Sequence, residues 1–155
     1  MNINYEDKTK EELIEIIDYY RHDSLTGMKL RKDFEVELVE KFYNEDTFYL
    51  VMFDVNNLHT INRDEGYAAG NDLIRRVANH ISFYCPKKSY RYGGDEFMVF
   101  SDTEPDFTNI NCLEACYASI SSEGFRTPQE MLKDLDQLLT LEKINLHKGV
   151  DDRRQ

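Results

Sequence analysis

SYRYGGDEFMVF, at residues 89–100, consists of two runs of β-forming residues on either side of a Gly-Gly pair. Such a pair between β-rich runs is a strong hairpin signal. We therefore predict two antiparallel strands, at Ser89–Tyr92 and Phe97–Phe100, joined by a turn at the glycine pair. Asp95 and Glu96 follow the turn, so the hairpin tip carries two adjacent acidic side chains.

Two further strands are predicted on either side of this hairpin in the sequence. Residues 47–55 (TFYLVMFDV) are almost continuously apolar and rich in β-formers, which predicts a central strand buried on both faces. Asp54 places a carboxylate near the end of that strand. Ala115–Ser121 has the composition of another strand.

Four stretches predict helices around these strands. Thr9 and Glu12 form a capping-box pattern at the start of a helix that runs to about residue 22. Residues 31–43 and 71–83 have apolar residues at helical spacing, and Pro128 suits the first turn of a last helix. The residues expected to face inward from the last three helices are Phe34, Leu38, Val39 and Phe42, then Leu73, Ile74, Val77, Ala78 and Ile81, then Met131, Leu132, Leu135, Leu138 and Leu139. Helices alternate with strands, so the fold class is α/β or α+β, a central sheet with helices on it.

The composition fits one ordinary domain. The chain has 155 residues, of which 41% are apolar, enough for a core. Its formal net charge of −11 opposes binding to DNA or RNA, which needs a basic footprint. No apolar run reaches the roughly 18 residues of a membrane span, and the polar first residues are no signal peptide. Three cysteines without a CxxC pair suit free thiols, so we expect a cytoplasmic protein without a zinc site.

Three acids are the candidates for chemistry. Strand ends and hairpin tips are where a sheet presents side chains to a ligand, and two neighbouring tips would bring Asp54 and Asp95 together. Close carboxylates repel unless a cation lies between them, and Mg²⁺ prefers a few carboxylates, waters and substrate phosphates. The pattern therefore predicts a metal site for phosphoryl or nucleotidyl transfer. The alternative is that Asp95 and Glu96 only solvate the hairpin and that Asp54 ends its strand.

Longer motifs around these acids resemble the GGDEF domains, the diguanylate cyclases. The stretch Tyr90–Phe97 (YRYGGDEF) matches the full signature of that family. The stretch Asp23–Gly27 (DSLTG), followed by Arg31, resembles its DxLTGLxNR motif. The spacing of its DxDxFKxxNDxxGHxxGD stretch is kept by Asp54, Asn62, Gly66 and Gly70, and its AD-x-ALYxAK segment resembles Asp136–Lys143.

The resemblance implies a palm-like fold with a mostly antiparallel sheet, over residues 23–150, behind an N-terminal helix at 1–22 and before a charged tail at 151–155. It implies that each subunit holds one nucleoside triphosphate and that two subunits form a homodimer about a two-fold axis. Each 3′-hydroxyl then attacks the α-phosphate of the other nucleotide, which gives a cyclic dinucleotide, cyclic di-GMP from two GTP, and pyrophosphate. The implied cofactor is Mg²⁺ or Mn²⁺.

The same resemblance assigns the site residues. Asp54, Asp95, Glu96 and the carbonyl of Val55 would bind the metal, and Asp95 and Glu96 would be catalytic, Glu96 by assisting the attacking hydroxyl. The implied nucleotide-binding residues are Gly93 and Gly94 beside the phosphates, Asn62 at the base, Lys143 at the terminal phosphates, and also His59, Asn71 and His147.

Several positions depart from the family pattern. Asn56 replaces a second acid, His59 replaces a lysine, and His147 replaces an arginine, which makes it a weaker and pH-dependent phosphate ligand. The product-inhibition motif RxxD is absent, since residues 84–87 are YCPK. Residues 101–114 are short for the helix that family members place there, so we expect that helix to be missing or reduced to one turn.

Asn71 stands where family members have the aspartate that receives guanine. A carboxylate offers two acceptors to the N1–H and N2–H₂ donors of guanine, whereas an amide offers one acceptor and one donor. The amide matches N1 and N6 of adenine instead. We therefore expect relaxed selectivity, in which GTP is used and ATP competes.

Two questions stay open at this point. The chain is either a working cyclase, as its three intact acids indicate, or a degenerate, non-catalytic GGDEF module that binds nucleotide or a protein partner, as its altered C-terminal end indicates. The N-terminal helix is either a dimer stalk or a plain packing helix.

Overall fold

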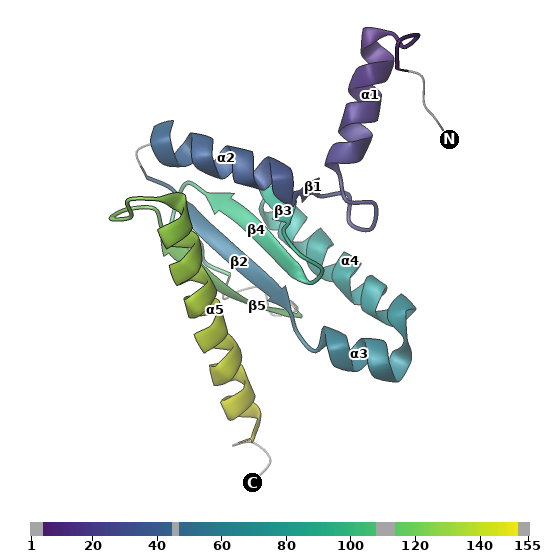
Figure 1. Cartoon of the computed structure of the whole chain (residues 1–155). Coiled ribbons are helices and arrows are strands. Elements are labelled where there is room, and N and C mark those ends of the chain that lie inside the picture. The colour runs from purple at the N-terminus through teal and green to yellow at the C-terminus, as the bar shows by residue number, and fades with distance from the viewer. Residues whose placement is uncertain (1–4, 45–46, 108–113, 152–155) are drawn as a thin grey trace.

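The computed structural model describes residues 5–44, 47–107 and 114–151, and it contains one five-stranded sheet with helices on both faces (Figure 1). The elements follow in the order α1 (Lys10–Arg21), β1 (Lys29–Leu30), α2 (Arg31–Asn44), β2 (Tyr49–Val55), α3 (Leu58–Glu65), α4 (Tyr67–Tyr84), β3 (Ser89–Arg91), β4 (Glu96–Ser101), β5 (Ala115–Ser121) and α5 (Pro128–Asp151). The predicted strands and the proline start of the last helix are confirmed within two residues.

The sheet has the order β1-β3-β4-β2-β5, and all its pairs except β1 with β3 are antiparallel. Strand β2 lies between β4 and β5 and is buried on both faces, as its apolar sequence predicts. Only Tyr49 and Asp54, near its ends, are partly exposed. The register sets Asp54 opposite Glu96 of β4 on one side and opposite Cys116 of β5 on the other. The mixed α+β class and the mostly antiparallel sheet are thus confirmed.

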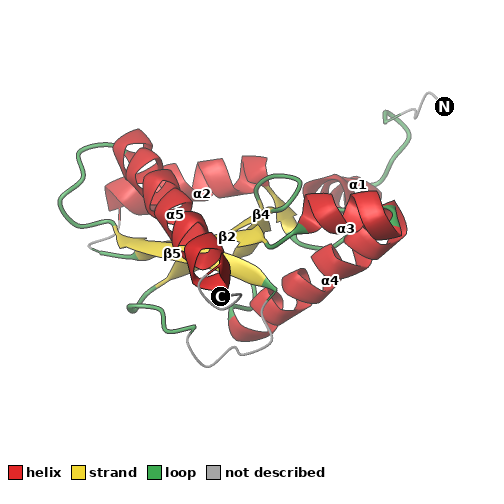
Figure 2. Ribbon diagram, turned by 90° about the horizontal axis from the view of Figure 1, so that it is seen from below, coloured by secondary structure: helices red, strands yellow, loops and turns green. Residues whose placement is uncertain are grey.

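Helices α2 and α5 cover one face of the sheet, and α4 covers the other (Figures 1 and 2). All five residues expected to face inward from residues 71–83 are buried. Two expectations in the other helices are wrong, because Val39 is 46% exposed and Leu138 is 39% exposed. In each of those helices most of the buried side chains recur every four residues, a spacing that leaves out these two positions. The residues on those faces are Phe34, Leu38 and the partly buried Phe42, and Met131, Leu135 and Leu139.

The segment after β4 contributes an aromatic side chain to the core. Residues 102–107 contain no helix, as expected, and the rest of the segment, 108–113, lies outside the described residues. Phe107 is buried on the α4 face of the sheet, where its ring packs 5.0 Å from that of Phe53 and 5.2 Å from that of Tyr117. A loop side chain therefore joins the apolar face of α4 in the same core cluster.

Helix α1 extends away from the sheet (Figure 1). Its capping box is confirmed, since Thr9 Oγ1 accepts from the Glu12 amide (3.1 Å) and Glu12 Oε2 accepts from the Thr9 amide (2.8 Å). It has no buried residue, and Ile14, Ile17 and Tyr20 are each more than half exposed. Helix α1 therefore does not bury an apolar face against its own domain.

Among residues 5–44, 47–107 and 114–151, we find no helix that combines the length and apolar character needed to cross a bilayer.

Candidate active site

The predicted meeting of two strand ends is present in the structure. The amide of Val55 donates to the carbonyl of Asp95 (2.9 Å), so the hairpin tip is fixed against the end of β2. Asp54 and Asp95 line one pocket of about 380 Å³, and Glu96 is the ladder partner of Asp54. The other lining residues are Val55, Asn56, Asn57, Leu58, His59, Lys143 and Leu146.

Two of the three carboxylates, those of Asp54 and Glu96, lie where their ionised form is disfavoured. Burial raises the pKa of the Asp54 carboxyl, and the charge of Asp95 raises it further, against the opposing effect of Lys143. Burial likewise raises the pKa of Glu96, and the charges of Asp95 and Asp54 add to that increase. Carboxylates whose ionised form is disfavoured in this way are stabilised by a cation placed among them.

Lys143 supplies one positive charge from α5. Its Nζ lies 2.8 Å from Asp54 Oδ2, and the lysine is 40% exposed whereas the aspartate is 14% exposed. Burial by itself would lower the pKa of Lys143, but the pairing with Asp54 raises it above its usual value. The two partners shift in conflicting ways because burial dominates at Asp54 and pairing dominates at Lys143. At 2.8 Å the lysine and the aspartate form an ion pair.

The donor chemistry of this site suits a divalent metal. Asp54, Asp95 and Glu96 are oxygen ligands of the kind that Mg²⁺ and Mn²⁺ take. Within the part of the chain that the structure describes, no three His, Cys, Asp or Glu side chains converge closely enough to hold a metal alone. A complete coordination shell would therefore include other oxygens, such as the Val55 carbonyl and phosphate oxygens, which is how Mg²⁺ is usually held.

Helix α3 begins at the same pocket. Its N-cap residue, Asn57, has a left-handed backbone (φ 58°), a conformation that asparagine tolerates better than most residues. The Asn57 side chain makes no capping hydrogen bond, so it leaves the first amides of the helix available to another acceptor. Because residues 56–59 line the pocket, this helix start can receive an anion there.

The glycine pair of the signature has a different role from the expected one at its first position. The amide of Gly93 already donates to the Glu96 carbonyl (3.1 Å), so it is not open to a phosphate. A Cβ on Gly93 would lie 2.5 Å from Glu96 Oε2, which shows that glycine there makes room for the Glu96 carboxylate. Gly94 is exposed and has nothing within 4 Å of its missing Cβ, so no side chain crowds this position.

The two asparagines expected at the base lie at the junction of α3 and α4. A Cβ on Gly70 would overlap Asn62 Oδ1, so the glycine allows the Asn62 side chain to lie against α4. Asn71 is the next residue of α4 and is exposed. Neither asparagine lines the carboxylate pocket, so the structure places the junction outside it. His147 belongs to α5, at a position whose side chain is outside the described residues.

Sequence reasoning missed the contact that holds the hairpin. Arg91 Nη1 donates to both carboxylate oxygens of Asp23 (2.9 Å each), and its Nη2 donates to the Gly94 carbonyl (2.7 Å). Asp23 also accepts from the amides of Leu25 and Thr26 and from the Thr26 hydroxyl. Both residues stand in the motifs quoted above, but a single sequence does not indicate that positions 68 apart are partners.

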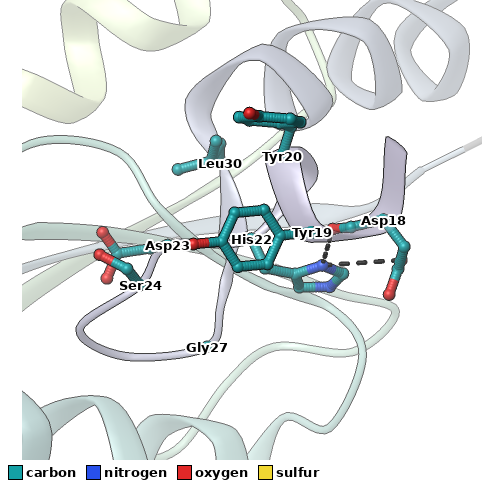
Figure 3. A pocket seen from close by; sticks show the side chains of 8 residues that line it. All are labelled: Asp18, Tyr19, Tyr20, His22, Asp23, Ser24, Gly27 and Leu30. Carbon is teal, nitrogen blue, oxygen red and sulfur yellow. Dashed lines mark hydrogen bonds and ion pairs between the residues drawn. The ribbon is translucent and has the colours of Figure 1, made fainter. Parts of the chain in front are cut away.

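A larger hollow, of about 690 Å³, lies between the end of α1 and the turn at residues 23–27 (Figure 3). Its lining includes Tyr19, Tyr20 and His22 but none of the signature acids. The ring of His22 is turned toward Asp18, with Nδ1 2.7 Å from the Asp18 carbonyl oxygen and 3.6 Å from its carboxylate. The larger hollow therefore contains none of the carboxylates that the sequence predicts for the chemistry, whereas the smaller pocket contains Asp54 and Asp95.

Comparison with known proteins agrees with this geometry. The chain is 27% identical over 96 residues to diguanylate cyclase VdcA of Vibrio cholerae, covering 61% of this chain and 28% of that protein. It is 36% identical over 80 residues to the probable diguanylate cyclase DgcI of Escherichia coli, covering 50% of this chain and 18% of that protein. The chain therefore spans less than a third of the length of these relatives.

A solved structure described as the coiled coil and GGDEF domain of DgcB from Caulobacter crescentus, in complex with c-di-GMP, has the same fold. Its TM-score is 0.73 over 88% of this chain and 87% of that one, at 20% identity. The family model described as diguanylate cyclase, GGDEF domain, matches residues 20–130, which include both Asp23 and the signature hairpin. By that match over most of its length, this chain is a member of the GGDEF domain family.

Proposed function

We propose that this chain is a metal-dependent nucleotidyltransferase that joins two nucleoside triphosphates into a cyclic dinucleotide, chiefly cyclic di-GMP from GTP. The observation that carries the proposal is the grouping of Asp54, Asp95 and Glu96 at one end of the sheet, beside the open start of α3. Curated relatives that are named diguanylate cyclases support it.

The carboxylate pocket is the proposed reaction centre. Asp54, Asp95 and the Val55 carbonyl would hold the metal, with Glu96 beside them. The bound metal would activate the 3′-hydroxyl and neutralise charge on the triphosphate. Glu96 is the residue that we assign to receive the hydroxyl proton. The start of α3, Gly94 and the side chains of His59, Lys143 and His147 would hold the phosphates.

The reaction needs two such sites. In each half, the 3′-oxygen of one nucleotide bonds to the α-phosphorus of the other, the bond between the α- and β-phosphates breaks, and pyrophosphate leaves. A second identical step closes the ring, so two copies must face each other about a two-fold axis. We assign residues 23–150 to the catalytic domain and α1 to the contact between copies, because Ile14, Ile17 and Tyr20 are exposed along it.

Product analysis tests the proposal. The protein, incubated with each nucleoside triphosphate and Mg²⁺ or Mn²⁺, should yield cyclic di-GMP from GTP on chromatography with mass detection. Asp95→Asn is the matched inactive control, in which turnover should fall roughly 10³-fold or more. A wild-type protein that binds nucleotide but forms no cyclic product would instead be the non-catalytic module.

The base preference is the finer part of the proposal. Asn71 lies beside the Asn62 and Gly70 contact, and its amide would set a donor against a donor of guanine. A mismatch of about 1–3 kcal/mol corresponds to roughly 5- to 150-fold in relative rate. Asn71→Asp should therefore raise the ratio of kcat/KM for GTP to that for ATP by an amount in this range. Equal ratios in the two proteins would remove Asn71 from base recognition.

A further inference from the structure

We propose that Lys143 acts as an internal cation in the resting protein, occupying Asp54 until a metal ion displaces it. This inference rests on the proposed function, because it takes the metal from the carboxylate chemistry of that site. It concerns what this chain's own lysine does before any substrate arrives, and it predicts a measurable competition between the lysine and the metal for one carboxylate.

The contact between Lys143 and Asp54 lies where a metal ion would have to bind. Nζ of Lys143 lies 2.8 Å from Oδ2 of Asp54, so it covers a carboxylate oxygen that a metal at this strand end would need. Asp54 is 14% exposed, which leaves few directions from which a second cation could approach it. Lys143 is also the sole lysine or arginine among the residues that line the described pocket. No other lysine or arginine of that lining can therefore neutralise Asp54.

The helix that carries the lysine allows the contact to be exchanged. The first half of α5 is anchored in the core by Met131, Leu135 and Leu139, all buried. Beyond them, Leu141 and Ile144 are largely exposed, so the turn that carries Lys143 has few packing contacts to hold it. A lysine has a flexible four-carbon stem and can follow a new anion without movement of the helix core.

Two consequences follow for the order of binding. A metal ion alone must break the ion pair, so its affinity in the absence of nucleotide is reduced. A triphosphate offers Lys143 a second acceptor, so it frees Asp54 and assists the metal, and by linkage the metal assists the triphosphate. The lysine thus couples the two ligands through a single exchangeable contact.

Metal binding without nucleotide tests this inference. Mn²⁺ is titrated into the full chain, and the free ion is measured by electron paramagnetic resonance. Lys143→Met removes the charge and keeps an apolar stem, and it should bind Mn²⁺ roughly 3- to 10-fold more tightly than wild type, as expected for a partly exposed ion pair. Lys143→Gln should shift in the same direction, and Lys143→Arg should stay near wild type.

Two controls make the result specific. Lys133→Met removes one charge from an exposed position of the same helix and should leave the Mn²⁺ affinity unchanged. In an Asp54→Asn background, Lys143→Met should no longer tighten Mn²⁺ binding, because its partner is absent. The inference is overturned if Lys143→Met binds Mn²⁺ no more tightly than wild type, or if Lys133→Met shifts the affinity equally. Wild-type turnover of GTP is measured separately, so loss of the proposed function would leave this comparison standing.

Discussion

Two ion pairs flank the signature hairpin, and they differ in how many partners each acid has. The carboxylate of Asp23 accepts hydrogen bonds from the guanidinium of Arg91 and from three donors of its own turn. Asp54 has one charged partner, Lys143, through one contact. The first pair is 15% and 16% exposed, whereas the lysine of the second is 40% exposed.

The pKa shifts of Asp23 and Asp54 reflect this difference in the number of partners. Burial would raise the pKa of Asp23, but hydrogen bonds from Thr26 and Arg91 outweigh it and lower that pKa below its usual value. The pKa of Asp54 is raised, because burial outweighs its one lysine. The fold therefore stabilises the ionised form of Asp23, which positions the hairpin, and disfavours the ionised form of Asp54 in the pocket. Such a division is expected where one carboxylate serves the structure and the other awaits a ligand.

The largest effect should separate the two acids by activity. Asp54→Asn should reduce cyclic dinucleotide formation roughly 10³-fold or more, because it removes a carboxylate that we propose as a metal ligand. Its free energy of unfolding should change by less than about 1 kcal/mol, since folding gains little from that buried charge. Steady-state rates and urea denaturation give the two numbers. A variant that keeps its rate, or that loses as much stability as a variant of Asp23, would erase the distinction.

The next effect belongs to stability. Asp23→Ala leaves the Arg91 guanidinium without its carboxylate and removes the acceptor of the turn, so the free energy of unfolding should fall by about 2–3 kcal/mol. The melting temperature should fall by several degrees. Chemical denaturation of the two proteins, with unchanged far-ultraviolet circular dichroism as the check on folding, measures this. A loss below about 0.5 kcal/mol would mean that the contact does not hold the hairpin.

A pH series sharpens the assignment to Asp23. Its folded pKa lies below the unfolded value of about 4, so the stability that it contributes is present above that value and is lost as pH falls through the folded pKa. The difference in unfolding free energy between wild type and Asp23→Asn should therefore be full at pH 6–7 and shrink below about pH 4. If the difference in unfolding free energy between the two proteins grew as the pH fell, the pKa of Asp23 would not be lowered in the folded protein.

The smallest change in stability is expected at an exposed ion pair that neither holds the hairpin nor lines the carboxylate pocket. Arg75 and Asp72 are 49% and 64% exposed and lie within one turn of α4. Arg75→Met should change the free energy of unfolding by no more than about 0.5 kcal/mol, as is usual for exposed pairs. The variant is thus a baseline for Asp23→Ala under the same denaturant titration, and a larger loss would show that charge removal in general destabilises this acidic protein.

The sequence could predict the parts of this molecule that depend on local pattern. The apolar run before Asp54 could belong only to a buried strand, and the glycine pair between β-rich runs fixed the hairpin. Those two elements suffice to bring Asp54 and Asp95 to one pocket. The helical spacing from Leu73 to Ile81 predicted five of the six buried residues of α4, and the buried Gly70 lies before the predicted start of that helix.

The rest depends on contacts between distant residues, which pattern does not reveal. Nothing in the surroundings of Phe107 marks it as a core residue, because it stands in a polar, turn-forming segment. The partner of Lys143 follows from how α5 crosses the sheet, and the partner of Arg91 from where the turn after α1 ends. The apolar residues of α1 suggested a helix but could not show that it leaves the sheet.

The position of β2 has a consequence for synthesis on the ribosome. This apolar strand pairs with β4 and β5, both of which are made later, and with no strand made earlier among the described residues. At about 5–20 residues per second, the 66 residues from Asn56 to Ser121 take roughly 3–13 s to appear. Until β4 is made the YLVMFDV segment has no partner strand, and until β5 is made one of its edges stays unpaired, which is the condition that favours aggregation or capture by a chaperone. The nascent chain is therefore most vulnerable before β5 leaves the exit tunnel, long after its most apolar strand has emerged.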